Sequence, residues 1–277
     1  MIIIEPIGGL ANRMRVIASG IWLKGILNTD LTIIWNENYE LNCPFDLLFE
    51  NSDAFKIISK PISYRYLKPS NEVGLIKRTL FSLRNKLIGI DYCIIEGNFP
   101  SNTWIGINIL SILSAQKDKN IYIQTCQEFG DNIPSFKYLI PIKKIKDKIN
   151  LITKNFNQLV VGVHIRRTDN VISIEKSPIE LFIKAIEKKL ITEEKTTFFL
   201  CSDDHEVEKK IISTFGNSKI IINRKENSRI TIHGMQDAVT DLYCLSYTSE
   251  IFGSYWSSFT EVAAKFNNTQ LTIIKID

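Results

Sequence analysis

The residues with the clearest chemistry lie at 160–169, where the run VVGVHIRRTD joins apolar residues to two arginines, a threonine and an aspartate. Val and Ile at this density are typical of a buried strand. Open α/β sheets bind ligands beyond the carboxyl ends of their strands, so paired guanidiniums there predict an anion site. An arginine can grip a pyrophosphate through two parallel hydrogen bonds. We therefore expect Arg166 to hold an anionic leaving group.

The neighbours of this arginine allow more than one role. Arg167 can pair with Asp169 or Asp203 as a scaffold, and in the plainer interpretation both arginines form only structural ion pairs. His164 is either a residue of the donor site or a strand-end histidine that is satisfied within the core.

Two further segments place polar residues where a predicted strand ends. In FFLCSDD, Asp203 can bind ribose hydroxyls or a base edge, or orient an arginine, whereas Asp204 is typical of a helix cap. In GSYWSSF, Ser257 or Ser258 begins a helix whose free N–H groups and dipole suit a phosphate. Ordinary serine capping is the alternative there.

The N-terminal motif GGLANR follows a short strand and opens a helix. Gly9 lets backbone amides approach an anion or a sugar, and we expect Asn12 and Arg13 to point into the same space. The motif lacks both the GxGxxG spacing and the P-loop lysine. A tight turn without a ligand fits it equally well.

Taken in this order, the motifs resemble the superfamily of GDP-fucose-dependent fucosyltransferases, which includes α1,2-, α1,6-, nodulation and protein O-fucosyltransferases. The resemblance rests on GGLANR (8–13), HIRRTDN (164–170), FLCSDD (199–204), and DLYCLS with GSYWSSFTEVA (241–263). It implies a GT-B-like α/β fold with two Rossmann-like domains facing each other across a cleft. It also implies an inverting glycosyltransferase that takes GDP-fucose as donor substrate and needs neither a metal nor a cofactor.

On the donor side, the resemblance makes Arg166 the essential arginine on the β-phosphate. It places the other donor-binding positions at His164, Arg167, Asp203, Asp241, Ser257 and Ser258, with Gly9, Asn12 and Arg13 closing the cleft from the N-terminal domain.

On the acceptor side, a carboxylate would remove the proton of the attacking hydroxyl. The candidates are Asp169 and Glu175, the latter matched to the family's glutamate only across a one-residue gap. The α1,6-type members carry a lysine where this chain has Asn170. The sequence shows no histidine or cysteine metal cluster, and Asp203-Asp204 lacks the context of a DxD metal site.

The elements that must position these residues alternate along the chain, which predicts parallel sheets covered by helices. We expect strands at 2–5, 31–35, 92–96, 121–127, 159–165, 197–201, 219–222, 250–253 and 271–274, and helices at 10–27, 178–190, 204–215, 237–247 and 258–266. The character changes at 134–157. We therefore expect a domain boundary near residue 140. The resemblance implies an acceptor-side Rossmann-like domain over 1–140 and a nucleotide-sugar-binding Rossmann-like domain over 141–277.

The composition of the 277 residues, 44% hydrophobic and 23% charged with a net charge of +4, is ordinary for a globular protein and does not favour nucleic acid. Five scattered cysteines suggest buried thiols, and no run suits a signal peptide or membrane span, so we expect a cytoplasmic protein.

The lysines of 143–154 form either a solvated helix face or a surface near an inner membrane that carries the acceptor. The partners implied are a GDP-sugar and a glycan or glycolipid; the oligomeric state stays open.

Two alternatives remain at this point. The same scaffold can use another nucleotide sugar, or the chain can be a non-catalytic module that binds a nucleotide sugar or a glycan.

Overall fold

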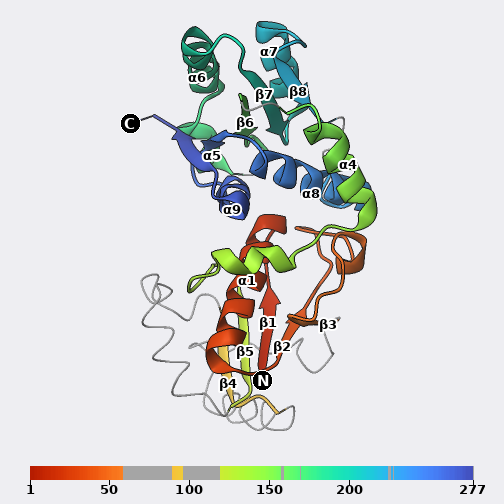
Figure 1. Cartoon of the computed structure of the whole chain (residues 1–277). Coiled ribbons are helices and arrows are strands. Elements are labelled where there is room, and N and C mark those ends of the chain that lie inside the picture. The colour runs from red at the N-terminus through yellow and green to blue at the C-terminus, as the bar shows by residue number, and fades with distance from the viewer. Residues whose placement is uncertain are drawn as a thin grey trace. The chain divides into compact units, whose positions relative to one another are not determined.

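The computed structural model describes residues 1–58, 89–95, 119–156, 159–168, 170–223, 226 and 228–276. It separates the chain into two compact units, Met1–Ile140 and Pro141–Asp277 (Figure 1). Within the described residues, each unit is built on a five-stranded sheet whose strands all run parallel. The predicted α/β class with parallel sheets is confirmed.

The first unit has the strand order β3-β2-β1-β5-β4. Its elements are β1 (Ile2–Pro6), α1 (Leu10–Leu27), β2 (Leu31–Ile34), η1 (Phe45–Leu47), β3 (Lys56–Ile58), β4 (Tyr92–Ile95), β5 (Ile121–Thr125) and η3 (Ile133–Tyr138). Helix α1 lies close against the sheet because a Cβ at Gly20 would come within 2.5 Å of the Ile4 side chain. The turn between β1 and α1 therefore has a fixed position at the carboxyl edge of the central strand.

The second unit has the strand order β10-β9-β6-β7-β8. Its elements are α4 (Lys143–Thr153), β6 (Val160–Ile165), α5 (Val171–Lys176), α6 (Ile179–Thr192), β7 (Thr197–Ser202), α7 (His205–Phe215), β8 (Ile220–Ile222), α8 (Ile232–Ser246), β9 (Glu250–Ser254), α9 (Ser258–Asn267) and β10 (Gln270–Ile274). The chain passes from β6 to β7 and β8 and then returns to β9 on the other side of β6. This reversal makes the β6/β9 edge a topological switch point, where open α/β sheets bind ligands.

Helices cover both faces of the second sheet, as Figure 1 shows. Val161 and Val163 of β6 pack with Phe182 of α6 on one face. The alternate residues of β6 face α8 and α9, since a Cβ at Gly162 would meet Leu245. Strand β6 is buried along its whole length, which explains its continuous run of apolar residues.

Most predicted elements appear within one or two residues of their expected bounds. Helix α8 is an exception, since it begins at Ile232 rather than near residue 237. The side chain of Thr231 caps this helix by accepting a hydrogen bond of 3.1 Å from the Gly234 N–H. Strand β3 and helix α5 were not predicted. The prediction that residue 96 ends a strand lies outside the described residues.

Within the described ranges, no helix is both long and apolar enough to cross a bilayer. All five cysteines are free, and three of them are buried. Burial raises the pKa of the Cys43 and Cys93 thiols to about 12, so both remain protonated at neutral pH.

Gly253 allows α9 to lie against the end of β9, because a Cβ there would come within 2.4 Å of the Thr260 methyl group. We predict that Gly253→Ala lowers the free energy of unfolding by about 1–3 kcal/mol through overpacking. Gly25→Ala is the control, since a Cβ at this exposed helical site meets nothing within 4 Å. It should stabilise the protein by about 0.5–1 kcal/mol. Urea denaturation followed by circular dichroism measures both, and equal effects would contradict the close approach.

Candidate functional site

The turn that follows β6 is held from one side by Asp203, at the end of β7. Asp203 Oδ1 accepts a hydrogen bond of 2.7 Å from the Arg167 N–H. Asp203 Oδ2 accepts bonds from the Thr168 hydroxyl (2.6 Å) and N–H (3.3 Å). A carboxylate that accepts several such bonds fixes the backbone it binds. Asp203 therefore orients residues 166–168, which we call the arginine turn. Orienting an arginine was one of the roles expected for Asp203.

The other side of the same turn is held by Ser254, at the end of β9. The buried Ser254 hydroxyl accepts a bond of 3.0 Å from the Arg166 N–H and donates one of 3.3 Å to the His164 carbonyl. Arg166 is half-buried and lies at the β6/β9 switch point. The structure thus places Arg166 at the carboxyl edge of the sheet, as expected, and its role as an anion clamp stays a prediction.

Arg167 has a different environment from its neighbour. Its guanidinium donates to the carbonyls of Ile174 (3.1 Å) and Ser177 (2.6 Å), at the end of α5. Burial lowers the pKa of Arg167, and the carboxylates of Glu180 and Asp203 oppose this shift. The expected pairing with Asp203 exists, but it is made by the backbone N–H. This geometry favours a scaffold role for Arg167 over contact with the donor.

His164 is buried and joins β6 to α9. Its Nδ1 lies 3.0 Å from the Thr260 hydroxyl and its ring stacks on Phe259, with centroids 4.8 Å apart. These contacts favour the interpretation of His164 as a satisfied core residue. Its role in binding the donor stays a prediction.

The N-terminus of α9 lies directly after the switch point. Ser257 occupies the cap position but makes no capping bond, and its buried hydroxyl lies 3.5 Å from His164 Nδ1. Ser258 is the first helical residue and is half-buried. The first N–H groups of a helix have no intrahelical acceptor and favour an anion. The first N–H groups of α9 follow β9, and β9 is the neighbour of β6, the strand that leads into Arg166.

Asp241 lies inside α8. It is buried, and its Oδ1 accepts a bond of 2.9 Å from Asn223 Nδ2, just beyond β8. Asn223 was not predicted, because it follows a short strand without any recognisable motif. Contact of Asp241 with a nucleotide stays a prediction.

The candidate bases lie at or near α5. Glu175 is exposed on this short helix, while Asp169 lies outside the described residues. Asn170 caps α5 by accepting a bond of 3.0 Å from the Ser173 N–H, and it donates one of 3.1 Å to the Trp256 carbonyl. The asparagine that replaces the family's lysine therefore links α5 to the segment after β9.

In the first unit, the Gly8-Gly9 turn lies at the carboxyl end of β1. Gly8 has a φ of +84°, which favours glycine, and its N–H donates to Glu40 Oε2 at 3.1 Å. A Cβ on Gly9 would meet nothing within 4 Å, so there is open space beside this residue. Asn12 Oδ1 is buried and has no hydrogen-bond partner among the residues described. Gly9 and Asn12 remain candidates for contact with a ligand.

Arg13 is fully buried, which differs from the expectation that it points into a ligand space. Its guanidinium donates to Gly8 O (2.8 Å), Asn36 O (2.5 Å) and Asn38 Oδ1 (3.0 Å), and lies over the Trp35 ring. Burial lowers its pKa to about 10, so it remains charged at neutral pH. Arg13 thus fixes the glycine turn, and its contact with a donor stays a prediction.

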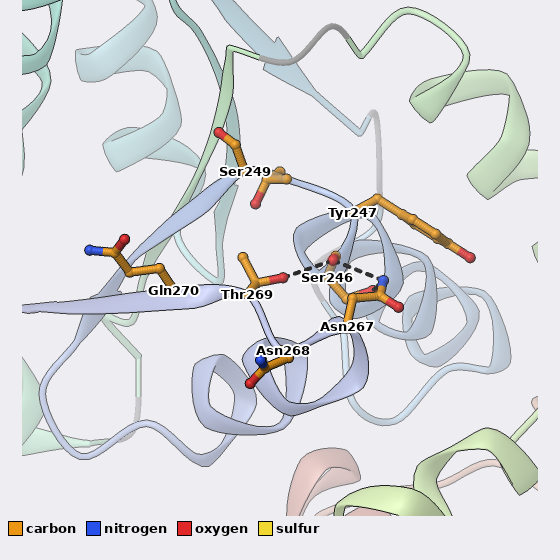
Figure 2. A pocket seen from close by; sticks show the side chains of 8 residues that line it. Ser246, Tyr247, Ser249, Asn267, Asn268, Thr269 and Gln270 are labelled. Atoms are coloured by element: carbon orange, nitrogen blue, oxygen red, sulfur yellow. Dashed lines mark hydrogen bonds between the residues drawn. The ribbon is translucent and has the colours of Figure 1, made fainter.

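A hollow of about 560 Å³ lies at the opposite, amino edge of the second sheet (Figure 2). Its polar groups bind one another: the Ser246 carbonyl accepts bonds from Asn267 Nδ2 (2.9 Å) and the Thr269 hydroxyl (3.0 Å). It contains none of the predicted site residues. Because open α/β sheets bind ligands at the carboxyl edge, we assign the site to the β6/β9 edge.

No family model matches the chain, and no characterised protein matches it by sequence. Solved structures do match it. NodZ α-1,6-fucosyltransferase soaked with GDP-fucose has a TM-score of 0.63 at 16% identity, over 96% of this chain and 92% of NodZ. Arabidopsis thaliana FUT1 with GDP has a TM-score of 0.63 at 14% identity, over 98% and 69% of the two chains.

POFUT1 in complex with GDP is also similar, with a TM-score of 0.58 at 14% identity over 99% of this chain and 98% of POFUT1. At these identities the likeness is one of fold. It confirms that the chain has the GT-B-like α/β fold of the GDP-fucose fucosyltransferases, as the resemblance implied.

The adjacent aspartates Asp203 and Asp204 offer a matched test of the arginine turn. Asp203→Asn exchanges an acceptor oxygen for an N–H donor opposite the turn, so we predict a loss of about 1–3 kcal/mol in the free energy of unfolding. Asp204 caps α7 by accepting from the Glu206 N–H, and asparagine caps equally well. Asp204→Asn should therefore change stability by less than about 0.5 kcal/mol. Equal losses in thermal denaturation would refute this assignment.

Proposed function

We propose that the chain transfers fucose from GDP-fucose to a hydroxyl of a glycan acceptor, with inversion and without a bound metal. The observation that carries this proposal is the position of Arg166, held by Ser254 at the switch point of the second sheet. The shared fold supports the choice of donor, because NodZ was soaked with GDP-fucose and FUT1 and POFUT1 are in complex with GDP.

The donor half of the reaction needs positive charge where GDP departs. As the bond from the sugar to the β-phosphate breaks, negative charge grows on the phosphate oxygens. In the proposed complex, the Arg166 guanidinium and the first N–H groups of α9 stabilise this charge. Arg167 and Asp203 keep the turn in place before the donor arrives, so little reorganisation is needed.

The acceptor half of the reaction needs a base. Glu175 is our candidate because it is an exposed carboxylate on α5, which follows the arginine turn, and Asp169 is the alternative. The base takes the proton of the acceptor hydroxyl while its oxygen attacks the anomeric carbon opposite the leaving phosphate. Attack from that side inverts the configuration.

The acceptor and its location form a further part of the proposal. We infer that the acceptor is a glycan or a glycolipid and that transfer takes place in the cytoplasm. Helix α4 carries the basic stretch, but Lys148 pairs with Asp237 (2.5 Å) and Lys144 donates to Gln236 (3.1 Å) of α8. These two lysines therefore bind α8. Peripheral contact with an anionic inner membrane depends on the other lysines of the stretch, such as the exposed Lys143, which pairs with Asp147, and the exposed Lys154.

The strongest alternative is a module that binds a nucleotide sugar without catalysis. It is favoured by Asn170, which replaces a lysine of the α1,6-type enzymes with a capping residue. Release of free fucose or transfer to any acceptor pool would exclude it. Use of another nucleotide sugar is a narrower alternative, and calorimetric titration with GDP, UDP, ADP and CMP separates it. The proposed donor requires GDP to bind most tightly.

We predict that Arg166→Ala lowers transfer from labelled GDP-fucose by about 100-fold or more, because it removes a contact with the developing charge. Arg166→Lys keeps the charge but loses the two-pronged geometry, so it should recover only part of the rate. Both variants should keep the wild-type melting temperature. Activity of Arg166→Ala within about tenfold of wild type would remove this residue from the mechanism.

A further inference from the structure

Trp256 has an unusual backbone conformation for a large aromatic residue. Its φ is +54°, in the left-handed region. Among the described residues, the other non-glycine residues with positive φ are Asn28 and Asn268, which end α1 and α9. Asparagine tolerates this conformation, whereas a bulky residue there is a genuine outlier. Such strain concentrates at functional sites.

The surrounding structure holds this conformation in place. The Tyr255 N–H donates to the Ser177 hydroxyl at 2.8 Å, and the Trp256 carbonyl accepts from Asn170 Nδ2 at 3.1 Å. On either side, Ser254 binds the arginine turn and Ser257 lies against His164. Strained residues persist only where their neighbours fix them in this way.

The indole itself contributes little to the packing of the fold. The side chain is 63% exposed and makes no hydrogen bond or ring contact with any part of the chain that the structure describes. A buried aromatic would stabilise the protein through its area, but this one faces solvent. The strained backbone thus presents an exposed ring from a fixed backbone position.

The position of the ring indicates which part of a ligand it contacts. Trp256 lies between the end of β9 and the N-terminus of α9, beside the strand that carries Arg166. Under the proposed function, this is the phosphate end of the donor, and the group attached to the β-phosphate is the fucosyl ring. A 6-deoxy pyranose has an apolar face of C–H groups and a methyl group, which suits an indole surface.

We propose that Trp256 is a specificity-determining residue that stacks on the pyranosyl group of the donor and does not contact the nucleotide. This inference rests on the proposed function. It adds a contact that neither the arginine turn nor the helix N-terminus supplies.

The test compares Trp256→Asn and Trp256→Phe with wild type. Asparagine tolerates positive φ, so Trp256→Asn should keep or raise the melting temperature. Calorimetry should show GDP bound within twofold of wild type, but GDP-fucose weakened by about tenfold, the size of one lost stacking contact. Trp256→Phe keeps a ring and should lose less than about threefold. In NMR spectra, the fucose methyl signal should shift upfield with wild type and not with Trp256→Asn.

Tyr247→Asn is the matched control. This aromatic is 57% exposed, but it lies beside the hollow at the amino edge of the same sheet (Figure 2). The change should leave the affinities for GDP and GDP-fucose unaltered.

Three results would overturn the inference. A lower melting temperature of Trp256→Asn would make the indole part of the packing. Equal weakening of GDP and GDP-fucose would place the ring on the nucleotide, and unchanged affinity for both would remove it from the donor site. Failure of the wild-type protein to bind GDP would instead contradict the proposed function.

Discussion

The hydrogen bonds that Asp203 and Ser254 make to the turn after β6 determine where Arg166 can lie. A long cationic side chain on a mobile turn loses entropy when it binds, so a preformed turn lowers the cost of binding an anion. The parallel sheet provides this turn, because β7 and β9 flank β6 and their ends bracket it. Everything proposed for the donor depends on this arrangement.

The first unit fixes its own turn by a different means. Arg13 binds the Gly8 carbonyl and the loop after β2, while the buried Glu5 accepts bonds from Asn36 (2.7 Å) and the Tyr122 hydroxyl. Burying these charges is costly unless all of them are hydrogen-bonded, as they are here. The result is a defined carboxyl edge at β1, with open space beside Gly9.

The sequence predicted the features that depend on local residue patterns. Runs of β-branched residues marked the strands, and Asp204 was expected to cap α7, which it does. The sequence did not predict the features that depend on contacts with other parts of the chain. Arg13 is buried because residues 36–38 surround it, and α8 begins before its expected start because Thr231 caps it. The left-handed backbone of Trp256 depends on contacts with α5, which the sequence pattern did not reveal.

A crystal structure of the complex with GDP tests the central claim most directly. The account predicts the Arg166 guanidinium within about 3 Å of the β-phosphate oxygens, with the turn still held by Asp203 and Ser254. A guanidinium directed away from the nucleotide, or GDP bound away from the β6/β9 edge, would contradict it.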